Sequence, residues 1–237
     1  MILMSQMKST VSSLLDLRME IKRRNTGAIP GSGYFAPTKA SPLVEGLGLY
    51  DLASPQAVQA FSTQLDASPF QRETILRYSE AIHELSMDIG RKLGQSMGLL
   101  GDLFMGWPCQ FRMNKYNFTT EALGSSVMEK KSGAFIAVDP LPGTFLVNIG
   151  DIATVWSNGR FYNVKHRVVC KEATIRVSIA MFVLGPREEE VEAPPELVDS
   201  DHPRLYVPLT FEDYRKLRLS TRLVAGEALE FIRTTNC

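Results

Sequence analysis

The clearest pattern in the chain is a helical one between residues 68 and 98. Ser68-Pro69-Phe70-Gln71 predicts an N-cap, a proline at the first helical position and a capping box. Apolar side chains then recur at steps of three and four residues over about five turns, and Gly98 is placed to end the helix. These apolar positions are Ile75, Tyr78, Ile82, Leu85, Ile89 and Leu93. The pattern predicts a long amphipathic helix that packs across a sheet.

In the second half of the chain, the hydrophobic pattern changes to the two-residue alternation that is typical of β-strands. Residues 111–118 alternate, and residues 135–138 and 144–150 are short β-rich runs. Asn158-Gly159 lies between two further strand-like segments and predicts a hairpin. Short strands preceded by helices indicate an α+β chain with a mainly β core, of sandwich or jelly-roll type. A parallel sheet is not expected, because no helices alternate with these strands.

The remaining segments predict helices and loops around this core. Residues 11–22 suit a short helix, and residues 25–48 form a long loop or extended passage that could be the wall of a site. Residues 186–204 contain an acidic cluster and predict a solvated loop. A helix is expected to start at Thr210, and residues 225–232 are a further helical candidate.

These segments suggest three regions along the chain. We expect an N-terminal region of helices and loops over 1–108, the jelly-roll core over 109–186, and a C-terminal loop with helices over 187–237.

Composition narrows the partners of this chain. Of its 237 residues, 44% are hydrophobic, and 26 basic residues balance 26 acidic ones. The chain has no net positive charge that would favour binding to nucleic acid or to an acidic membrane surface, so the expected ligand is a small molecule. The three cysteines show no C-x-x-C spacing, which disfavours a disulfide framework and a structural zinc site. No apolar run is long enough for a signal sequence or a membrane span, and we expect a cytoplasmic protein.

The strand-like sequence after residue 160 holds the most chemical information. Alternation places Val164, His166 and Val168 on one face of a strand, and Arg176 and Ser178 on one face of the next. An imidazole suits ferrous iron, whereas an arginine beside a hydroxyl can grip a carboxylate. A lone histidine on a strand can equally be a structural residue, and the spacing to Arg176 and Ser178 is what favours a metal next to an acid.

Two other groups of polar residues are weaker candidates. Asn114 and Tyr116 share a strand face and could hydrogen-bond a ligand, or simply belong to an ordinary strand. His83 and His202 have no ligand partner at a useful spacing, and for both we expect surface or packing roles.

These residues resemble the plant iron(II)- and 2-oxoglutarate-dependent dioxygenases, which carry Asn-x-Tyr, His-x-Asp, a distal histidine and Arg-x-Ser. The similarity covers nearly the whole chain and is strongest to the branch that oxidises auxin. The segments that carry it are GSGYFAP, GLYDLASPQAV, LDASP, QFRMNKYNF, LPGTFLVNIGDIATVWSNGR, NVKHRV and DHPRLY.

The resemblance implies a fold, two cofactors and a substrate class. The fold is a double-stranded β-helix, a jelly roll with flanking helices. His166 would be the distal Fe(II) ligand, Arg176 and Ser178 the clamp on the far carboxylate of 2-oxoglutarate, and Tyr116 with Asn114 a further contact to 2-oxoglutarate. The substrate would be a small carboxylate such as indole-3-acetic acid.

One departure from the family pattern changes the picture. The His-x-Asp pair should precede VMEKKSGAFIAV, but Gly124-Ser125-Ser126 runs directly into it. An internal segment is therefore missing, the family's usual N-terminal strands are not found, and the jelly roll is expected to be incomplete. The iron site of this family needs two histidines and one carboxylate, of which His166 alone remains. Asp139 and Asp151 are weak candidates to replace the missing iron ligands.

The missing pair leaves an alternative open. The chain could be a catalytically inactive pseudoenzyme, or a truncated splice or gene-model product. Losing a barrel strand would expose unpaired edges, so aggregation is then expected.

Overall fold

The computed structural model describes residues 2–29, 31–39, 41–124, 136–139, 141–221, 223 and 226–234. The chain forms two compact units, and each combines segments that are distant in sequence. The first unit comprises Met1–Lys92, Pro108–Val138 and Arg167–Val183, and the second comprises Leu93–Trp107, Asp139–His166 and Leu184–Cys237. The division into regions 1–108, 109–186 and 187–237 stays a prediction.

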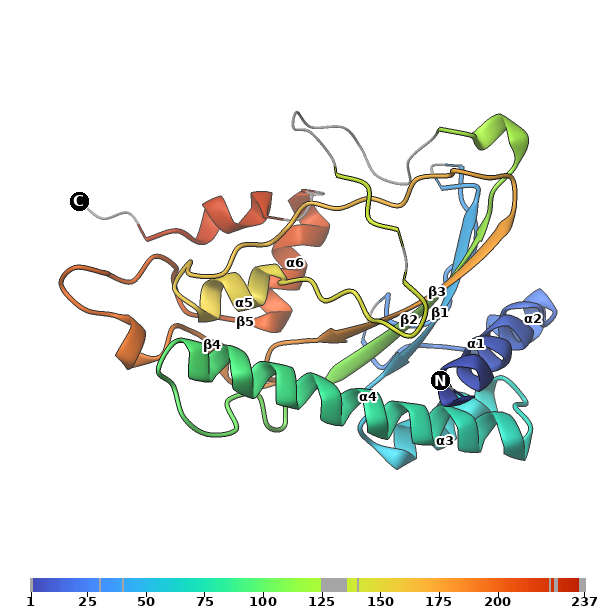
Figure 1. Ribbon diagram of the computed structural model, residues 1–237, viewed down its shortest axis with the longest axis horizontal. Helices are drawn as coiled ribbons and strands as arrows, with labels where there is room; N and C mark the ends of the chain where they lie inside the picture. The colour runs from blue at the N-terminus through green and yellow to red at the C-terminus, as the bar shows by residue number, and fades with distance from the viewer. Residues whose placement is uncertain are drawn as a thin grey trace. The chain divides into compact units, whose positions relative to one another are not determined.

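The first unit is built on a three-stranded antiparallel sheet. Its strands are β1 (Val44–Tyr50), β2 (Cys109–Asn117) and β3 (Ile175–Val183), in that order across the sheet (Figure 1). In β2, Cys109, Phe111 and Met113 point into the hydrophobic core, so the even-numbered residues point to the opposite face. This alternation agrees with the pattern predicted for residues 111–118.

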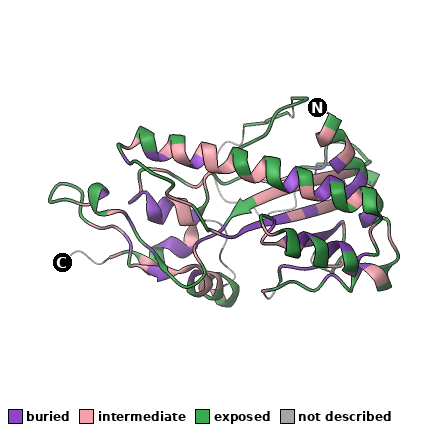
Figure 2. Ribbon diagram, turned by 90° about the horizontal axis from the view of Figure 1, so that it is seen from below, coloured by how far each residue is buried: buried purple, intermediate pink, exposed green. Residues whose placement is uncertain are grey.

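Helices cover the core face of this sheet. They are α1 (Ile2–Leu15), α3 (Pro55–Gln64) and α4 (Pro69–Ser96), with α2 (Met19–Lys22) and the short helix η1 (Thr120–Ala122) completing the unit (Figure 1). Most buried side chains of these helices and strands form one cluster. Figure 2 colours the buried residues purple along the ribbon. The largest fully buried members of the cluster are Met7, Val11, Leu14, Leu15, Leu47, Leu52, Val58, Leu65, Ile75, Phe111 and Met113.

The long helix α4 begins where the sequence predicts. The amide of Gln71 donates to Ser68 Oγ at 3.2 Å, and the amide of Ser68 donates to Gln71 Oε1 at 2.7 Å. This is the reciprocal pattern of a capping box. The helix ends at Ser96, and Gly98 has a φ of 80°, the left-handed conformation that favours glycine after a helix. The predicted helix, its capping box and its terminal glycine are confirmed.

The predicted helix over 11–22 is wrong in its extent. Helix α1 starts at Ile2 and ends at Leu15, and a short non-helical segment separates it from α2, which starts at Met19. Met7, Val11, Leu14 and Leu15 are buried at helical spacing, so burial against the sheet sets the length of α1.

The second unit contains α5 (Asp151–Trp156), β4 (Glu190–Val191), η2 (Pro195–Leu197), β5 (Leu209–Thr210), α6 (Phe211–Thr221) and η3 (Glu227–Ile232). Strands β4 and β5 pair antiparallel. The helix start predicted at Thr210 is confirmed, since the amide of Asp213 donates to Thr210 Oγ1 at 3.1 Å. Val155, Trp156, Tyr206 and Tyr214 belong to the core of this unit.

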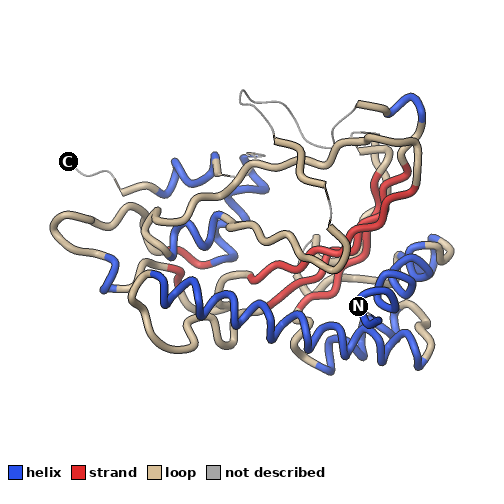
Figure 3. The backbone as a smooth tube through the Cα atoms, in the orientation of Figure 1, coloured by secondary structure: helices blue, strands red, loops and turns tan. Residues whose placement is uncertain are grey.

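Several predicted strands are absent from the described residues. Residues 136–139 and 141–150 adopt no helix or strand, and Figure 3 shows the corresponding described trace as loop. The predicted hairpin at Asn158-Gly159 is also wrong. Both residues have positive φ, 49° and 75°, and the amide of Gly159 donates to Thr154 O at 2.9 Å. The Asn-Gly pair therefore ends helix α5, because the left-handed conformation that suits a hairpin also suits a helix C-terminus.

Among the described helices, none combines the length and the apolar character that crossing a bilayer requires.

Candidate functional site

Four residues predicted to contact 2-oxoglutarate lie together on one face of the three-stranded sheet. Strand pairing places Asn114 opposite Ser178 and Tyr116 opposite Arg176. Asn114 Nδ2 lies 3.4 Å from Ser178 Oγ, and the guanidinium carbon of Arg176 lies 5.1 Å from the centroid of the Tyr116 ring. A cation at this distance over an aromatic face is attracted to the ring. The pairing explains how residues 60 and 64 positions apart in sequence form one polar cluster.

Arg176 has unused hydrogen-bonding capacity in this cluster. Its Nη1 atom is buried and has no hydrogen-bond partner in the described part of the chain. A buried charged donor without a partner is costly, and its occurrence points to a ligand. A guanidinium beside a hydroxyl is suited to a carboxylate, because it can donate two parallel hydrogen bonds. The cluster therefore fits one carboxylate of 2-oxoglutarate.

The segment Ser32–Phe35 packs closely over β1 on the same face. A Cβ atom at Gly46 would lie 2.4 Å from the Phe35 ring and 2.9 Å from Asn114 Oδ1. A Cβ atom at Gly48 would lie 1.7 Å from the carbonyl oxygen of Ser32. Both positions therefore need glycine, because they let the segment Ser32–Phe35, the candidate wall of the site, lie against β1.

Arg112 shares this face and was not anticipated from the sequence. Its Nη1 donates to the carbonyl oxygen of Gly33 at 2.8 Å, and its guanidinium carbon lies 5.0 Å from the centroid of the Phe35 ring. The signal was present in the alternation, because Gln110, Arg112, Asn114 and Tyr116 occupy successive positions on one strand face.

His166 does not lie on a strand. Residues 162–168, including Val164 and Val168, adopt no helix or strand, so the predicted shared strand face is wrong. A strand needs a hydrogen-bonded partner, and these residues have none in the named strands. The His166 side chain is exposed, and its Nδ1 lies 3.1 Å from the carbonyl oxygen of Val164.

Within the described residues, no group of three histidine, cysteine, aspartate or glutamate side chains could hold a metal ion. Asp151 is already engaged: its carboxylate accepts hydrogen bonds from Asn163 Nδ2, the Tyr214 hydroxyl and the amide of Gly226. Burial and the bond to Asp151 raise the pKa of Tyr214. These contacts give Asp151 a structural role in the second unit. The described residues thus do not assemble the three-ligand set that iron needs in this family.

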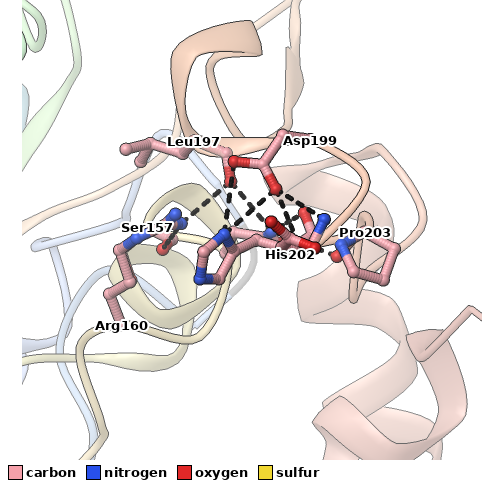
Figure 4. Close-up of polar contacts among 8 residues, drawn as sticks. Ser157, Arg160, Leu197, Asp199, His202 and Pro203 are labelled. Carbon is pink, nitrogen blue, oxygen red and sulfur yellow. Dashed lines mark hydrogen bonds and ion pairs between the residues drawn. The ribbon is translucent and has the colours of Figure 1, made fainter.

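His202 lies in a polar contact group of the second unit (Figure 4). Its Nδ1 lies 3.0 Å from Asp199 Oδ1, and its amide donates to the same oxygen at 2.7 Å. The hydrogen bond from the His202 amide, together with the contact of the His202 ring, holds the pKa of Asp199 below its usual value, although burial acts in the opposite direction. Arg160 Nη1 donates to the carbonyl oxygen of Leu197 at 2.9 Å in the same group (Figure 4). These contacts order a loop, in agreement with the surface role expected for His202, while His83 is half-buried on α4.

Comparison with known proteins identifies the family of this chain. The profile of the 2OG-Fe(II) oxygenase superfamily matches residues 103–185. The 2-oxoglutarate-dependent dioxygenase DAO of rice (Oryza sativa) is 48% identical, in an alignment that covers 96% of this chain and 84% of the rice protein. Jasmonate-induced oxygenase 2 of Arabidopsis thaliana is 30% identical, over 68% of this chain and 51% of that protein.

Solved structures give the same result. The crystal structure of the dioxygenase for auxin oxidation in rice matches with a TM-score of 0.88 and 47% identity, covering 98% of this chain and 86% of that one. Dioxygenase for auxin oxidation 1 from Arabidopsis thaliana, in a binary complex with 2-oxoglutarate, matches with a TM-score of 0.80 and 46% identity, covering 85% of both chains. The jelly-roll fold class predicted from the sequence is confirmed by these matches.

The alignment with rice DAO also bears on the missing segment. It spans 251 positions, more than the 237 residues of this chain, so the rice protein contains residues that have no counterpart here. This agrees with the internal deletion inferred from the sequence. The extent and level of the similarity establish that this chain belongs to the 2OG-Fe(II) oxygenase superfamily, whose cofactors are Fe(II) and 2-oxoglutarate.

Proposed function

We propose that this chain is a 2-oxoglutarate-dependent dioxygenase that acts on a small carboxylate such as indole-3-acetic acid. The buried Nη1 of Arg176, which has no hydrogen-bond partner among the described residues, carries this proposal, because a buried charged donor needs an anionic ligand. The 48% identity to rice DAO supports the substrate class.

In this proposal, Arg176 and Ser178 hold the far carboxylate of 2-oxoglutarate. The guanidinium supplies charge and paired donors, and the Ser178 hydroxyl adds one hydrogen bond. Tyr116 keeps the guanidinium in place through its ring, 5.1 Å away. Asn114, 3.4 Å from Ser178 Oγ, orients that hydroxyl and adds a further polar contact to the ligand.

His166 is the proposed Fe(II) ligand of this chain. A hydrogen bond from Nδ1–H to the carbonyl of Val164, over the observed 3.1 Å, would leave the lone pair of the imidazole on Nε2 for a metal. Iron supplies oxygen activation in this superfamily, and a site with one histidine is expected to bind it weakly. Loss of a single outer-shell partner already costs about 10–100-fold in affinity or activity.

Titration of the purified chain with 2-oxoglutarate tests the carboxylate clamp. We expect binding of 2-oxoglutarate, and a loss of about 10- to 100-fold in affinity for Arg176→Gln, the change that follows from losing a charged hydrogen bond. Arg24→Gln is the matched control, because Arg24 forms only an exposed ion pair with Asp66. Equal affinity in wild type and Arg176→Gln would contradict the assignment.

Turnover is a separate measurement. Succinate formation from 2-oxoglutarate, with Fe(II), oxygen and indole-3-acetic acid present, is expected to be slow and to depend on His166. If succinate forms at the same rate after His166→Ala, His166 is not the ligand. If 2-oxoglutarate binds but no succinate forms, the chain is the inactive binding protein left open by the missing His-x-Asp pair.

We also propose a cytoplasmic location. It rests on cysteine usage in the sequence, since the three cysteines are odd in number and show no C-x-x-C spacing. Fractionation of cells that produce the protein, followed by immunodetection, tests this location.

A further inference from the structure

The face that carries the 2-oxoglutarate clamp has a second arginine at its other end. Arg112 and Tyr116 are four residues apart on β2, or about 13 Å along the strand, and Arg176 lies opposite Tyr116. The two arginines therefore start from backbone positions far enough apart to serve two different ligands. Asn114 lies between them on the same face.

Arg112 is fixed in place but retains free donors. One nitrogen, Nη1, donates to the carbonyl oxygen of Gly33 at 2.8 Å, and a guanidinium has five N–H donors. None of the ion pairs found in the described part of the chain involves Arg112. Burial lowers the pKa of Arg112, but the group stays protonated under ordinary conditions. It is thus a half-buried cation available to an anion.

The neighbour of Arg112 is an aromatic ring. The Phe35 ring centroid lies 5.0 Å from the guanidinium carbon, and Phe35 packs against the small hydrophobic cluster that includes Tyr116. Phe35 and Asn114 both approach the point where a Cβ of Gly46 would sit, at 2.4 Å and 2.9 Å. Arg112, Phe35 and Asn114 therefore form a continuous row that leads to Ser178 and the clamp.

We infer that Arg112 and Phe35 form the substrate subsite, in which Arg112 binds the carboxylate of a planar aromatic acid and Phe35 contacts its ring. This inference deepens the proposed function and rests on it. A cation next to an aromatic wall selects a flat, apolar body with one negative charge, and it discriminates against the uncharged amide of the same acid. Arg112 is the specificity-determining residue, whereas Arg176 serves 2-oxoglutarate.

Calorimetric titration of the full chain tests the assignment with three probes: 2-oxoglutarate, indole-3-acetate and indole-3-acetamide. Wild type should bind indole-3-acetate at least about 10-fold more tightly than the amide, in keeping with a charged hydrogen bond. Arg112→Gln should lose this preference and keep its affinity for 2-oxoglutarate. Arg176→Gln should lose affinity for 2-oxoglutarate and keep the preference for indole-3-acetate over the amide. Arg112→Lys should keep part of this preference, because lysine retains the positive charge. The control is Arg24→Gln, an exposed arginine of the same unit.

The outcomes separate the two proposals. If the wild-type chain does not bind 2-oxoglutarate, the proposed function is refuted. Wild type that binds 2-oxoglutarate but shows no preference for indole-3-acetate over the amide, or an Arg112→Gln variant that keeps the preference, would refute the Arg112 subsite alone.

A second measurement needs no variant. Hydrogen exchange of the wild-type amides should slow in residues 31–35 and 110–114 when indole-3-acetate is added, beyond the effect of 2-oxoglutarate alone. Protection confined to other segments would overturn the assignment even if Arg112→Gln failed to fold.

Discussion

At the scale of single residues, the first unit contains a buried ion pair beneath the sheet. Lys22 Nζ lies 2.6 Å from Glu45 Oε2, with side chains only 9% and 10% exposed. Lys22 also donates to the carbonyl oxygen of Leu15 at 3.0 Å, and the Tyr34 hydroxyl donates to Glu45 at 3.0 Å. These contacts connect α1 and α2 to β1 and to the segment Ser32–Phe35.

Removing the charge of Lys22 should show how much free energy it costs to bury Glu45 without its partner. We expect Lys22→Met to lower the free energy of unfolding by about 3–5 kcal/mol, because Glu45 would be left buried without its partner. Urea unfolding measures this change. Arg24→Met provides the control, since the exposed pair Arg24–Asp66 should contribute less than about 1 kcal/mol. Similar losses in both variants would contradict the assigned difference.

Tyr34 makes part of the stability depend on alkaline pH. Burial, followed by the hydrogen bond to Glu45, raises the pKa of Tyr34 from 10.0 to about 12. The folded state therefore holds the proton more tightly than the unfolded state, and this contribution is fully present below pH 10. It is lost as the pH rises from 10 to about 12. Unfolding free energies of Tyr34→Phe should fall less steeply over this interval than those of wild type.

Burial also raises the pKa of Tyr78 and Tyr206, so the comparison needs a control. Tyr162 is 76% exposed, and Tyr162→Phe should follow the wild-type profile. An unchanged slope in Tyr34→Phe would refute the role given to Tyr34.

At the scale of elements, the caps of α4 show how local sequence sets a helix boundary. Ser68 and Gln71 satisfy each other's amides across the first turn. Such a pair needs no tertiary contact, so the sequence alone located the start of the helix correctly. The candidate wall of the site also depends on the sequence of a single element. The glycines of β1 leave the space that the segment Ser32–Phe35 occupies.

We expect Ser68→Ala to destabilise the protein by about 1 kcal/mol, the usual cost of losing an N-cap. Thermal unfolding with circular dichroism measures this effect. Ser12→Ala serves as the comparison, because the Ser12 hydroxyl bonds only to the carbonyl oxygen of Lys8 within α1 and is exposed. If both variants melt at the wild-type temperature, the capping box contributes nothing to stability.

At the scale of the whole molecule, strand β3 forms an edge of the three-stranded sheet in the part of the chain that the structure describes. Among the described residues, it pairs with β2 alone. Ile175, Phe182 and Val183 are 62%, 48% and 37% exposed, and the strand carries no lysine or proline. Leu146 and Val147, expected in a strand of their own, are 69% and 56% exposed. An unpaired edge with apolar side chains favours association with other chains.

Sedimentation velocity should therefore show self-association that increases with protein concentration. A lysine on the edge should oppose it, so we expect Ile175→Lys to sediment with a smaller associated fraction than wild type. Leu219→Lys adds the same charge at a residue of α6 that is 63% exposed, and should leave association unchanged. Equal effects of the two lysines would attribute the change to net charge rather than to the edge of β3.

The sequence by itself determined the features that depend on neighbours along the chain. It located α4 and its caps, and the alternation that puts Asn114 with Tyr116 and Arg176 with Ser178 on single strand faces. The tertiary structure decided the register that brings these pairs together, and the close packing of Phe35 beside Arg112. It also decided that residues 144–150 form no strand and that Asn158-Gly159 ends a helix. The reason is that helical periodicity and caps are local, whereas a strand exists only when a second segment satisfies its backbone.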